Sequence, residues 1–590
     1  MAKRKRKTQP EARRPKNLTD GQRTYRAHGK VLRTHSIGAV PIINRLLGRM
    51  RLHEFFARHL PPEDQRTKVD TPRVVLLVLR NLLISRQPMY GVAEWARNFS
   101  PKLFGFLPKD LEHLNDDRVG RCLDRVFKAL DSGLIMDVVT HVVREFDLCL
   151  DELHNDSTTV SFFGDYPGAD TEQDIAGQTA PAITWGHSKD HRPDLKQLLY
   201  ILTVSDDGGV PVYFQAASGN VVDDQTHQAT WKLLAELVGR PDFVYVADCK
   251  LATTETMNEI ARQQGRFITV LPASRKEDTQ FRKRLVEQPQ TVSWREAYRL
   301  ADEDGTLREV FRVCTDEQLS KEGYRLFWFH SRGKAESDAA TRARRLQRAT
   351  GELTDLRTRL GSPRTRFRAR DKVTAAVDAI LDAHAARGFL RVDIQAQQHE
   401  QYRQASRGRP TKNTKYTRHV QTRFHVTWEL DGKQLERAAA ADGVFPLITN
   451  LHDWKAADVL QAYKRQPTIE KRFSQLKTDF CVAPVYLKSV TRIVGLLAIY
   501  FFALMVQSLL ERELRQAMAT QRIDSLPLYP EGRACVRPTT RHVLDVFESI
   551  ARHTISKVGR DDFERFTTEL APLHRMILKL LGTPTTDYRA

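Results

Sequence analysis

The spacing of apolar residues changes near residue 150, and this change limits the folds that the chain can adopt. Before that point, apolar side chains recur every three or four residues, the period of a helix with one buried face. Asp70 and Thr71 before Pro72 predict one helix start, and Asn115 in LNDDRVGRCLDRVFKAL predicts another. After residue 150, the segment ELHNDSTTVSF alternates and is rich in Thr and Val, as strands are. Two similar runs, KQLLYILTVSD and VPVYFQAASG, flank an Asp-Asp-Gly-Gly turn at 206–209, which predicts a hairpin.

The segments that follow the hairpin predict an α/β fold. They are a helix from Asp224 to Leu237, the short buried strand FVYVAD, the helix ATTETMNEIARQQG and the strand RFITVLP. Three strands, a helix, a strand, a helix and a strand suit a mixed five-stranded sheet with helices on both faces, as in ribonuclease-H-like folds. The later segment GVFPLITN predicts one more strand.

The pattern divides the 590 residues into six regions. We expect a flexible basic arm at 1–35, a helical N-terminal domain at 36–145, the first part of the α/β core at 146–274, an α+β insertion subdomain at 275–440, the second part of the core at 441–510 and a helical C-terminal region at 511–590. The arm holds twelve Lys or Arg against two acidic residues. It therefore suits either phosphate contacts or a solubilising tail.

One segment, residues 493–510, has no charged residue over 18 positions, which is near the lower limit for a membrane span. Gln507 and Ser508 lie near its end, and no second such segment follows. We therefore interpret it as a buried core helix and expect no membrane partner, with a membrane span as the alternative.

The charge balance favours a polyanionic partner. The chain has 93 Lys and Arg against 73 Asp and Glu, a formal net charge of +20. Nucleic acid is the first candidate and an anionic membrane surface the second, while a generally basic surface is the unspecific alternative. The six cysteines are scattered without a CxxC pair, and no secretory signal begins the chain, so we expect a reducing cytoplasm.

Three carboxylates are the candidates for catalysis. Asp156 lies in the first alternating strand, Asp248 ends the strand FVYVAD, and Glu470 lies on a helix after the last strand. Carboxylates in such places are usually paired or bind metal, although a lone Asp at a strand end is more often a turn or cap residue. Converging, the three would suit a pair of Mg²⁺ ions, with Mn²⁺ as a possible substitute.

The spacing around Glu470 adds a second signal. Tyr463, Glu470 and Lys477 are seven residues apart, nearly two helical turns, so one continuous helix would place all three on one face. Tyr, Glu and Lys are the wrong residues for a core stripe. A solvated face with a chance pattern is the alternative.

Four segments resemble the signatures of DDE transposases of bacterial insertion sequences: HNDSTTVSFFG, GHSKDHRPDLKQ, VADCKL and YKRQPTIEKRFSQLK. They are most similar to the insertion-sequence-four superfamily, whose mark is Tyr-x2-Arg-x3-Glu-x6-Lys, and LNDDRVGRCLDRVF resembles its sixteen-thirty-four family. The resemblance spans about residues 36–510. It implies a ribonuclease-H-like core, Mg²⁺ dependence, a DNA-binding role for the N-terminal helices and a homodimer that joins two transposon ends.

The resemblance also implies roles for single residues. Asp156, Asp248 and Glu470 match the three catalytic, metal-binding carboxylates. Lys477 matches the lysine that contacts a phosphate near the cleaved end, and Tyr463 matches the tyrosine near the terminal nucleotide.

The sequence departs from the signature at the arginine. Gln466 stands there with Arg465 beside it, and Pro467 should break the helix one turn before Glu470. Either Arg465 makes the phosphate contact or that contact is lost.

Two basic segments add candidate DNA contacts. GHSKDHRPDLKQ, at 186–197, either approaches the DNA backbone through Arg192 or is an ordinary charged connection. SRGRPTK, at 406–412, resembles an AT-hook, so Arg407 and Arg409 should contact DNA in a narrow minor groove, with a basic turn as the alternative.

These observations predict a DNA transposase. It should cleave double-stranded DNA at the terminal inverted repeats of a transposon and join the freed 3′ hydroxyl to target DNA. A catalytically silent DNA-binding protein and a ribonuclease-H-like nuclease are the alternatives; metal-dependent nicking separates the first from a transposase, and a joining step separates the second.

Overall fold

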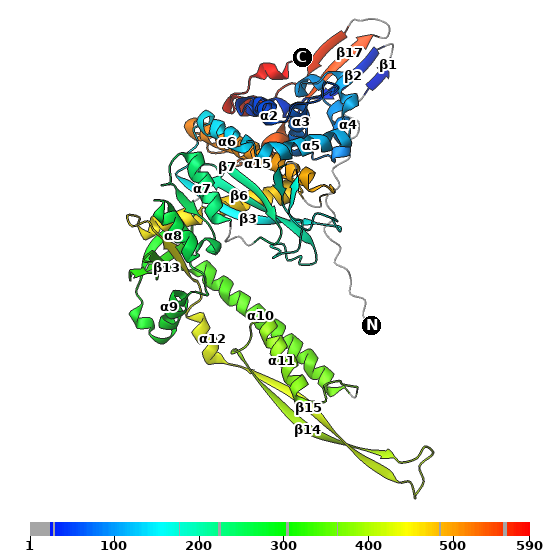
Figure 1. Cartoon of the computed structure of the whole chain (residues 1–590), viewed down its shortest axis with the longest axis vertical. Coiled ribbons are helices and arrows are strands. Elements are labelled where there is room, and N and C mark those ends of the chain that lie inside the picture. Colours follow the sequence, from blue (N-terminus) through cyan, green and yellow to red (C-terminus); the bar gives the residue numbers. More distant parts are fainter. Residues whose placement is uncertain are drawn as a thin grey trace. The chain divides into compact units, whose positions relative to one another are not determined.

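The computed structural model describes residues 24–589 except 28–29, 176, 222–225, 302–305, 363, 483–484, 486 and 558–562 (Figure 1). The chain forms two compact units. The first comprises Met1–Ile268 and Ala462–Ala590, and the second comprises Thr269–Gln461. Most of the predicted basic arm, residues 1–23, lies outside the described residues.

The centre of the first unit is a mixed sheet whose strands pair in the order β9-β8-β3-β6-β7. The strands are β3 (Glu152–Phe162), β6 (Lys196–Ser205), β7 (Pro211–Ser218), β8 (Val244–Val246) and β9 (Arg266–Val270). β6 is antiparallel to β3 and β7, whereas β8 is parallel to β3 and β9. The predicted hairpin at 206–209 and the predicted mixed α/β architecture are both confirmed.

A long buried helix, α15 (Val490–Thr520), packs against β7 and the N-terminal helices. It is long and apolar enough to cross a membrane, but its most apolar 18-residue window is entirely buried within the chain. The predicted core helix at 493–510 is therefore confirmed as an interior element. Apolar side chains surround this part of the helix because protein covers it on every side.

The first unit contains further helices, two of which begin at caps that the sequence predicts. They are α1 (Val40–Arg49), α2 (Leu52–His59), α3 (Thr71–Ile84), α4 (Val92–Arg97), α5 (Asp116–Leu130), α6 (Leu134–Glu145), α7 (His227–Val238), α8 (Thr254–Arg262), α14 (Pro467–Ser474), α16 (Thr540–Val546) and α17 (Pro572–Leu580). The Asp70 carboxylate accepts the Arg73 N–H at 2.9 Å, and Asn115 accepts the Arg118 N–H at 2.8 Å. Both predicted helix starts are confirmed, since each side chain satisfies an open N–H group.

A four-stranded sheet joins the two ends of the chain, in the order β1-β2-β17-β18. Its strands are β1 (Thr24–Ala27), β2 (Lys30–Ser36), β17 (Ala551–Lys557) and β18 (Phe563–Thr567). Residues 24–27 and 30–35 are thus strand where we expected a flexible arm, and the C-terminal region contains strands as well as helices. Periodicity could not reveal this sheet, because its short strands are stabilised by partners about 500 residues away.

The second unit contains the predicted insertion and is antiparallel. Its strands pair in the order β10-β11-β13-β16, with β12 beside β13 and a separate pair β14-β15. They are β10 (Trp294–Ala301), β11 (Leu307–Cys314), β12 (Gln318–Leu319), β13 (Arg325–Ser331), β14 (Leu390–Gln404), β15 (Tyr416–Leu430) and β16 (Val444–Thr449). The helices are α9 (Lys276–Glu287), α10 (Arg332–Gly361), α11 (Arg370–Ala383), α12 (Gly432–Ala439) and α13 (Ala456–Lys464), whose last residues belong to the first unit.

We predict that Gly495→Ala destabilises the protein. A Cβ atom at Gly495 would lie 2.3 Å from the Leu123 carbonyl oxygen, so α15 and α5 would have to separate. The expected loss in free energy of unfolding is about 1–3 kcal/mol, as for overpacked cores. Gly48→Ala is the control, because no atom lies within 4 Å of its Cβ position. Equal urea midpoints for the two variants would contradict the prediction.

Candidate carboxylate site

In the first unit, Asp156 lies on β3, and Asp248 follows the end of the neighbouring parallel strand β8. The β3–β8 register pairs Glu152 with Val244 and His154 with Val246. Asp156 and Asp248 each lie two residues beyond this last pair, and their two carboxyl groups interact electrostatically. Asp248 follows the end of β8, and its carboxylate accepts the N–H of Lys250 at 3.0 Å. The sequence FVYVAD therefore ends its strand with a carboxylate next to one in the middle of β3.

The Asp156 carboxyl is in an environment that resists its negative charge. Burial raises its pKa, and the neighbouring carboxylate of Asp248 adds to the rise. The Lys189 ammonium, 3.3 Å from Asp156 Oδ1, and the Ser157 N–H, 2.7 Å from the same oxygen, act in the opposite direction. On balance, the pKa of Asp156 lies above its usual value. A further positive charge nearby would therefore stabilise its ionised form.

The Tyr463 phenol interacts electrostatically with these two carboxylates and with the third, Glu470. Burial raises the pKa of its phenol to about 12, and Asp248, Glu470 and Asp156 all add to this rise. All three predicted carboxylates therefore act on one phenol. Within the described residues, no group of three His, Cys, Asp or Glu side chains is arranged to hold a metal ion. Metal binding by Asp156, Asp248 and Glu470 stays a prediction.

No continuous helix carries Tyr463, Glu470 and Lys477 in this described stretch, so the expected shared face is wrong, whereas the predicted break at Pro467 is confirmed. α13 ends at Lys464, α14 starts at Pro467, and a π-helical turn covers Gln475–Asp479. Pro467 has no N–H to continue the earlier helix, but it suits the first turn of a new one. The three side chains thus come from three successive segments.

Two lysines form ion pairs at the segment 186–197: Lys189, which belongs to the segment, and Lys477, which comes from the π-helical turn. Lys189 donates to the Ser157 carbonyl at 2.7 Å and to its hydroxyl at 2.8 Å, in addition to the pair with Asp156. Lys477 forms an ion pair with Asp190 at 2.6 Å, and Thr159 donates to the same carboxylate at 3.2 Å. The predicted phosphate-contacting lysine therefore faces the acidic residue next to Lys189.

The same segment contains Arg192, which was predicted to contact DNA. Its guanidinium holds Asp194 through two hydrogen bonds of 2.8 and 2.7 Å, and it lies over the ring of Phe163. Lys189, not Arg192, contacts Asp156. The sequence grouped Lys189 with Arg192 and Lys196 as the bases of this charge-rich segment but favoured Arg192, because nothing in the pattern distinguished Lys189.

Arg465 is held by a buried network. It pairs with both carboxylate oxygens of Glu152, at 2.7 Å for the Nε contact. Glu152 also contacts His154 at 2.8 Å, and the other ring nitrogen of His154 lies 3.1 Å from the Gln466 amide oxygen. Gln466 thus joins the link between α13 and α14 to β3, and the DNA contact predicted for Arg465 would compete with its pairing to Glu152.

A second buried network fixes α14, the helix that carries Glu470. Arg472, 1% exposed, donates to the carbonyl oxygens of Gly209 at 2.8 Å and Gly208 at 2.7 Å in the hairpin turn. It also pairs with Glu511 of α15 at 3.4 Å. Glu511 is 0% exposed and pairs in addition with Lys471 at 2.9 Å. The helix is therefore attached both to the sheet and to the core helix.

The charge of Glu511 is maintained by these cations. Burial alone would raise its pKa, but Arg472 and Lys471 hold the pKa below the usual value for a glutamate. Gln475 and the N–H of Thr540 donate to its other oxygen at 3.3 and 3.2 Å. A buried carboxylate with this many donors retains its charge.

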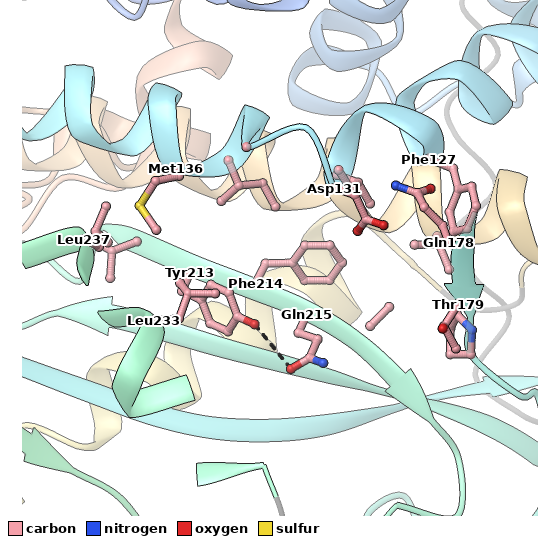
Figure 2. A pocket seen from close by; sticks show the side chains of 17 residues that line it. Phe127, Asp131, Met136, Gln178, Thr179, Tyr213, Phe214, Gln215, Leu233 and Leu237 are labelled. Carbon is pink, nitrogen blue, oxygen red and sulfur yellow. Dashed lines mark hydrogen bonds between the residues drawn. The ribbon is translucent and has the colours of Figure 1, made fainter. Parts of the chain in front are cut away.

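The unit also has a cavity of about 440 Å³ away from these residues (Figure 2). Its lining comes from the ends of α5 and α6, from β7 and from α7, with Phe127, Met136 and Leu237 among the apolar side chains. Tyr213 donates to Gln215 at 3.3 Å on one wall. None of the predicted site residues is among those that line it, so it is separate from the carboxylate site.

Arg407 and Arg409 lie in the second unit. They are exposed, in the turn at 405–415 that joins β14 to β15. They therefore belong to a different compact unit from the carboxylates.

Comparisons with known proteins give two findings. A family model described as a domain of unknown function, DUF4277, matches residues 32–140, which include α1 to α5. The fold is similar to a chain in a cryo-EM structure titled as a piggyBac transposase synaptic complex with hairpin DNA, at 9% identity and a TM-score of 0.22. That match covers 48% of this chain and 62% of the other, so this chain spans about three fifths of that length. Among curated proteins, no sequence matches the chain.

We predict that Glu511→Gln lowers the free energy of unfolding by about 3–5 kcal/mol at neutral pH, because it leaves Arg472 buried beside a neutral group. A lowered pKa means that Glu511 stabilises the fold above the usual glutamate pKa and stops doing so as pH falls through its folded value. The difference between wild type and variant should therefore narrow in acid, as measured by urea unfolding at several pH values.

Glu513→Gln is the matched control, since Glu513 lies on the same helix but is 24% exposed in its pair with Arg49. Its expected effect is below about 1 kcal/mol. An equal effect of both variants, or a gap that widens in acid, would contradict the assignment of Glu511.

Proposed function

We propose that the protein is a DDE transposase, a metal-dependent enzyme that cleaves and joins DNA. The observation that carries the proposal is the interaction of Asp156, on β3, with Asp248, just after the adjacent parallel strand β8, while Glu470 acts on the same phenol as both. Three antiparallel strands followed by two parallel ones, with Asp156 on the central strand, also support a ribonuclease-H-like core.

The donor chemistry suits Mg²⁺, with Mn²⁺ as a possible substitute. Carboxylate oxygens are the ligands that Mg²⁺ prefers. Burial, and then the charge of Asp248, raises the pKa of Asp156, so a nearby cation would stabilise its ionised form. Asp156, Asp248 and Glu470 would hold the metal. When bound, two Mg²⁺ ions activate the attacking oxygen and stabilise the leaving one in a displacement at phosphorus.

The chain's own residues would bind and orient the DNA end. Lys477 and Lys189 bring two ammonium groups to the carboxylates, where DNA phosphates could replace Asp190 and Asp156 as their partners. Tyr463 lies among the carboxylates as a neutral phenol at physiological pH, because its pKa is about 12. It can therefore pack against a terminal nucleotide and donate a hydrogen bond.

The proposed substrate is double-stranded DNA with transposon terminal inverted repeats. Hydrolysis of one phosphodiester would free a 3′ hydroxyl, which would then attack a phosphodiester of target DNA. The formal net charge of +20 supports a polyanionic substrate. A homodimer that joins two ends, acting at the nucleoid in the cytoplasm, completes the proposal.

A catalytically silent DNA-binding protein is the second candidate. Two observations favour it. In the described part of the chain, no group of three His, Cys, Asp or Glu side chains is arranged to hold a metal ion. In addition, Lys189 pairs with Asp156. Both candidates predict DNA binding. They differ in whether added Mg²⁺ produces a cut.

We predict that Asp156→Asn, Asp248→Asn and Glu470→Gln each abolish Mg²⁺-dependent nicking of a plasmid that carries the sequences flanking the gene. Each removes a charge needed to hold the metal, so the rate should fall at least about 1,000-fold, the scale of losses at catalytic groups. DNA affinity, measured by fluorescence anisotropy, should stay within a few-fold. Asp242→Asn, just before β8, is the control and should cut normally. Nicking by the Asp248 variant would show that the site is misassigned.

We predict that Arg407→Ala with Arg409→Ala weakens binding to duplex DNA and reduces its salt dependence. Removing two cations that contact DNA should lower the slope of log affinity against log salt by up to about 2. The measurement is anisotropy titration at several salt concentrations. Lys433→Ala, an exposed lysine on α12, is the control. An unchanged slope would show that the turn at 405–415 does not contact DNA.

A further inference from the structure

The strands β14 and β15 form a long two-stranded ribbon in the second unit (Figure 1). Its fifteen residue pairs run from Leu390 opposite Leu430 to Gln404 opposite Tyr416, without a register shift. Only the base packs on the rest of the unit, where Leu390, Phe424 and Val426 join the core that α10 and α11 form. An isolated two-stranded ribbon is marginally stable in water, so its outer part is suited to binding a partner.

The two faces of the ribbon differ in chemistry. Side chains alternate between faces along each strand, and directly opposed residues share a face. We call one face the core-side face, because it carries Phe424, Val426 and Ile394, which pack on α10 and α11. We call the other the polar face. Between residues 395 and 425 it consists of Gln395, Gln397, His399, Gln401, Arg403, Thr417, His419, Gln421, Arg423 and His425.

The outer part of the polar face has one character. Between residues 395 and 425, all ten of its side chains can form hydrogen bonds, none is acidic and none is aliphatic, whereas nearer the base the same face carries Asp393 and Glu429. Most are exposed, and Gln401, Gln421 and Arg423 are partly so. A solubilising surface would use charged residues of both signs. A face made of Gln, Arg, His and Thr instead matches the side chains that recognise base edges.

We propose that the polar face of this ribbon reads the sequence of double-stranded DNA in the major groove. A two-stranded ribbon fits the groove, which is about 12 Å wide. Gln can bond adenine and Arg can bond guanine through two hydrogen bonds each, and both patterns are exposed only in the major groove of B-form DNA. The inference rests on the proposed function for its ligand, and it adds which surface recognises the sequence.

The charge of the ribbon favours DNA over a second copy of the chain. Residues 395–425 hold seven Lys or Arg and one acidic residue, Glu400, which pairs with Arg418 on the core-side face. Two such ribbons would repel one another. Four of the cations, Arg407, Arg409, Lys412 and Lys415, lie in or beside the turn, where they can hold phosphates next to the groove. Duplex RNA is disfavoured because its major groove is too narrow for side chains to read.

The test is selection from a pool of random-sequence duplex DNA by the full-length protein in EDTA, where no cutting occurs. Wild type should enrich a defined motif. Gln397→Ala with Gln401→Ala should lose preference at one or more motif positions, by about 10- to 100-fold per position. Gln398→Ala with Gln404→Ala is the matched control, since it removes the same side chains from the core-side face and should leave the motif intact.

A second readout identifies the groove and does not depend on those variants. Replacing guanine by 7-deazaguanine in the selected duplex removes an acceptor in the major groove, so it should weaken binding by wild type. The same replacement should matter less to Arg403→Ala with Arg423→Ala, if these arginines recognise guanine.

Three results would overturn the inference: no motif with wild type, an unchanged motif with the Gln397 and Gln401 variant, or loss of dimers in that variant with the motif intact. The proposed catalysis is tested separately. A polar-face motif without any Mg²⁺-dependent nicking would support the ribbon inference and refute the transposase. Mg²⁺-dependent nicking with a motif that the Gln397 and Gln401 variant leaves unchanged would support the transposase and refute the ribbon inference.

Discussion

The buried pair of Arg472 and Glu511 determines where the candidate site is built. Glu511 is 0% exposed and Arg472 1% exposed, so neither charge has water to solvate it. Each is compensated by the other and by fixed donors and acceptors, among them the carbonyl oxygens of the 208–209 turn. Since two buried charges cost far more apart than together, the pair holds α14 against β3, β6 and α15. Glu470 lies on that helix, two residues before Arg472.

The sheet supplies the other two carboxylates by a different constraint. Asp156 lies on β3 and Asp248 follows the neighbouring strand β8, so burial and the nearby charge of Asp248 together make the ionised form of Asp156 costly. Lys189 offsets part of that cost from the segment between β5 (Gln178–Ala180) and β6. The site thus combines a rigid sheet, a rigid helix and cationic side chains on a connecting segment. Such a combination allows phosphate groups to exchange for protein carboxylates as partners of the lysines.

Local patterns in the sequence predicted much of this. Alternation gave the strands of the first sheet, Asp70 and Asn115 marked helix starts, and the uncharged run at 493–510 indicated the core helix. Features that depend on distant partners were missed. The β2–β17 pairing, the Arg465–Glu152 ion pair and the Arg472–Glu511 pair join residues far apart in the chain, so no periodicity marks them. The seven-residue spacing of Tyr463, Glu470 and Lys477 indicated one shared helix face. That face does not form, because Pro467 and a π-helical turn interrupt the helix.

The central claim is that Asp156, Asp248 and Glu470 share divalent metal ions. Crystals of the full-length protein soaked in Mn²⁺, with data collected at the manganese absorption edge, test it directly. The account predicts an anomalous difference peak within bonding distance of oxygens from at least two of the three carboxylates, with Lys189 displaced from Asp156. Mn²⁺ bound only elsewhere, with the pair of Lys189 and Asp156 intact at saturating metal, would contradict it.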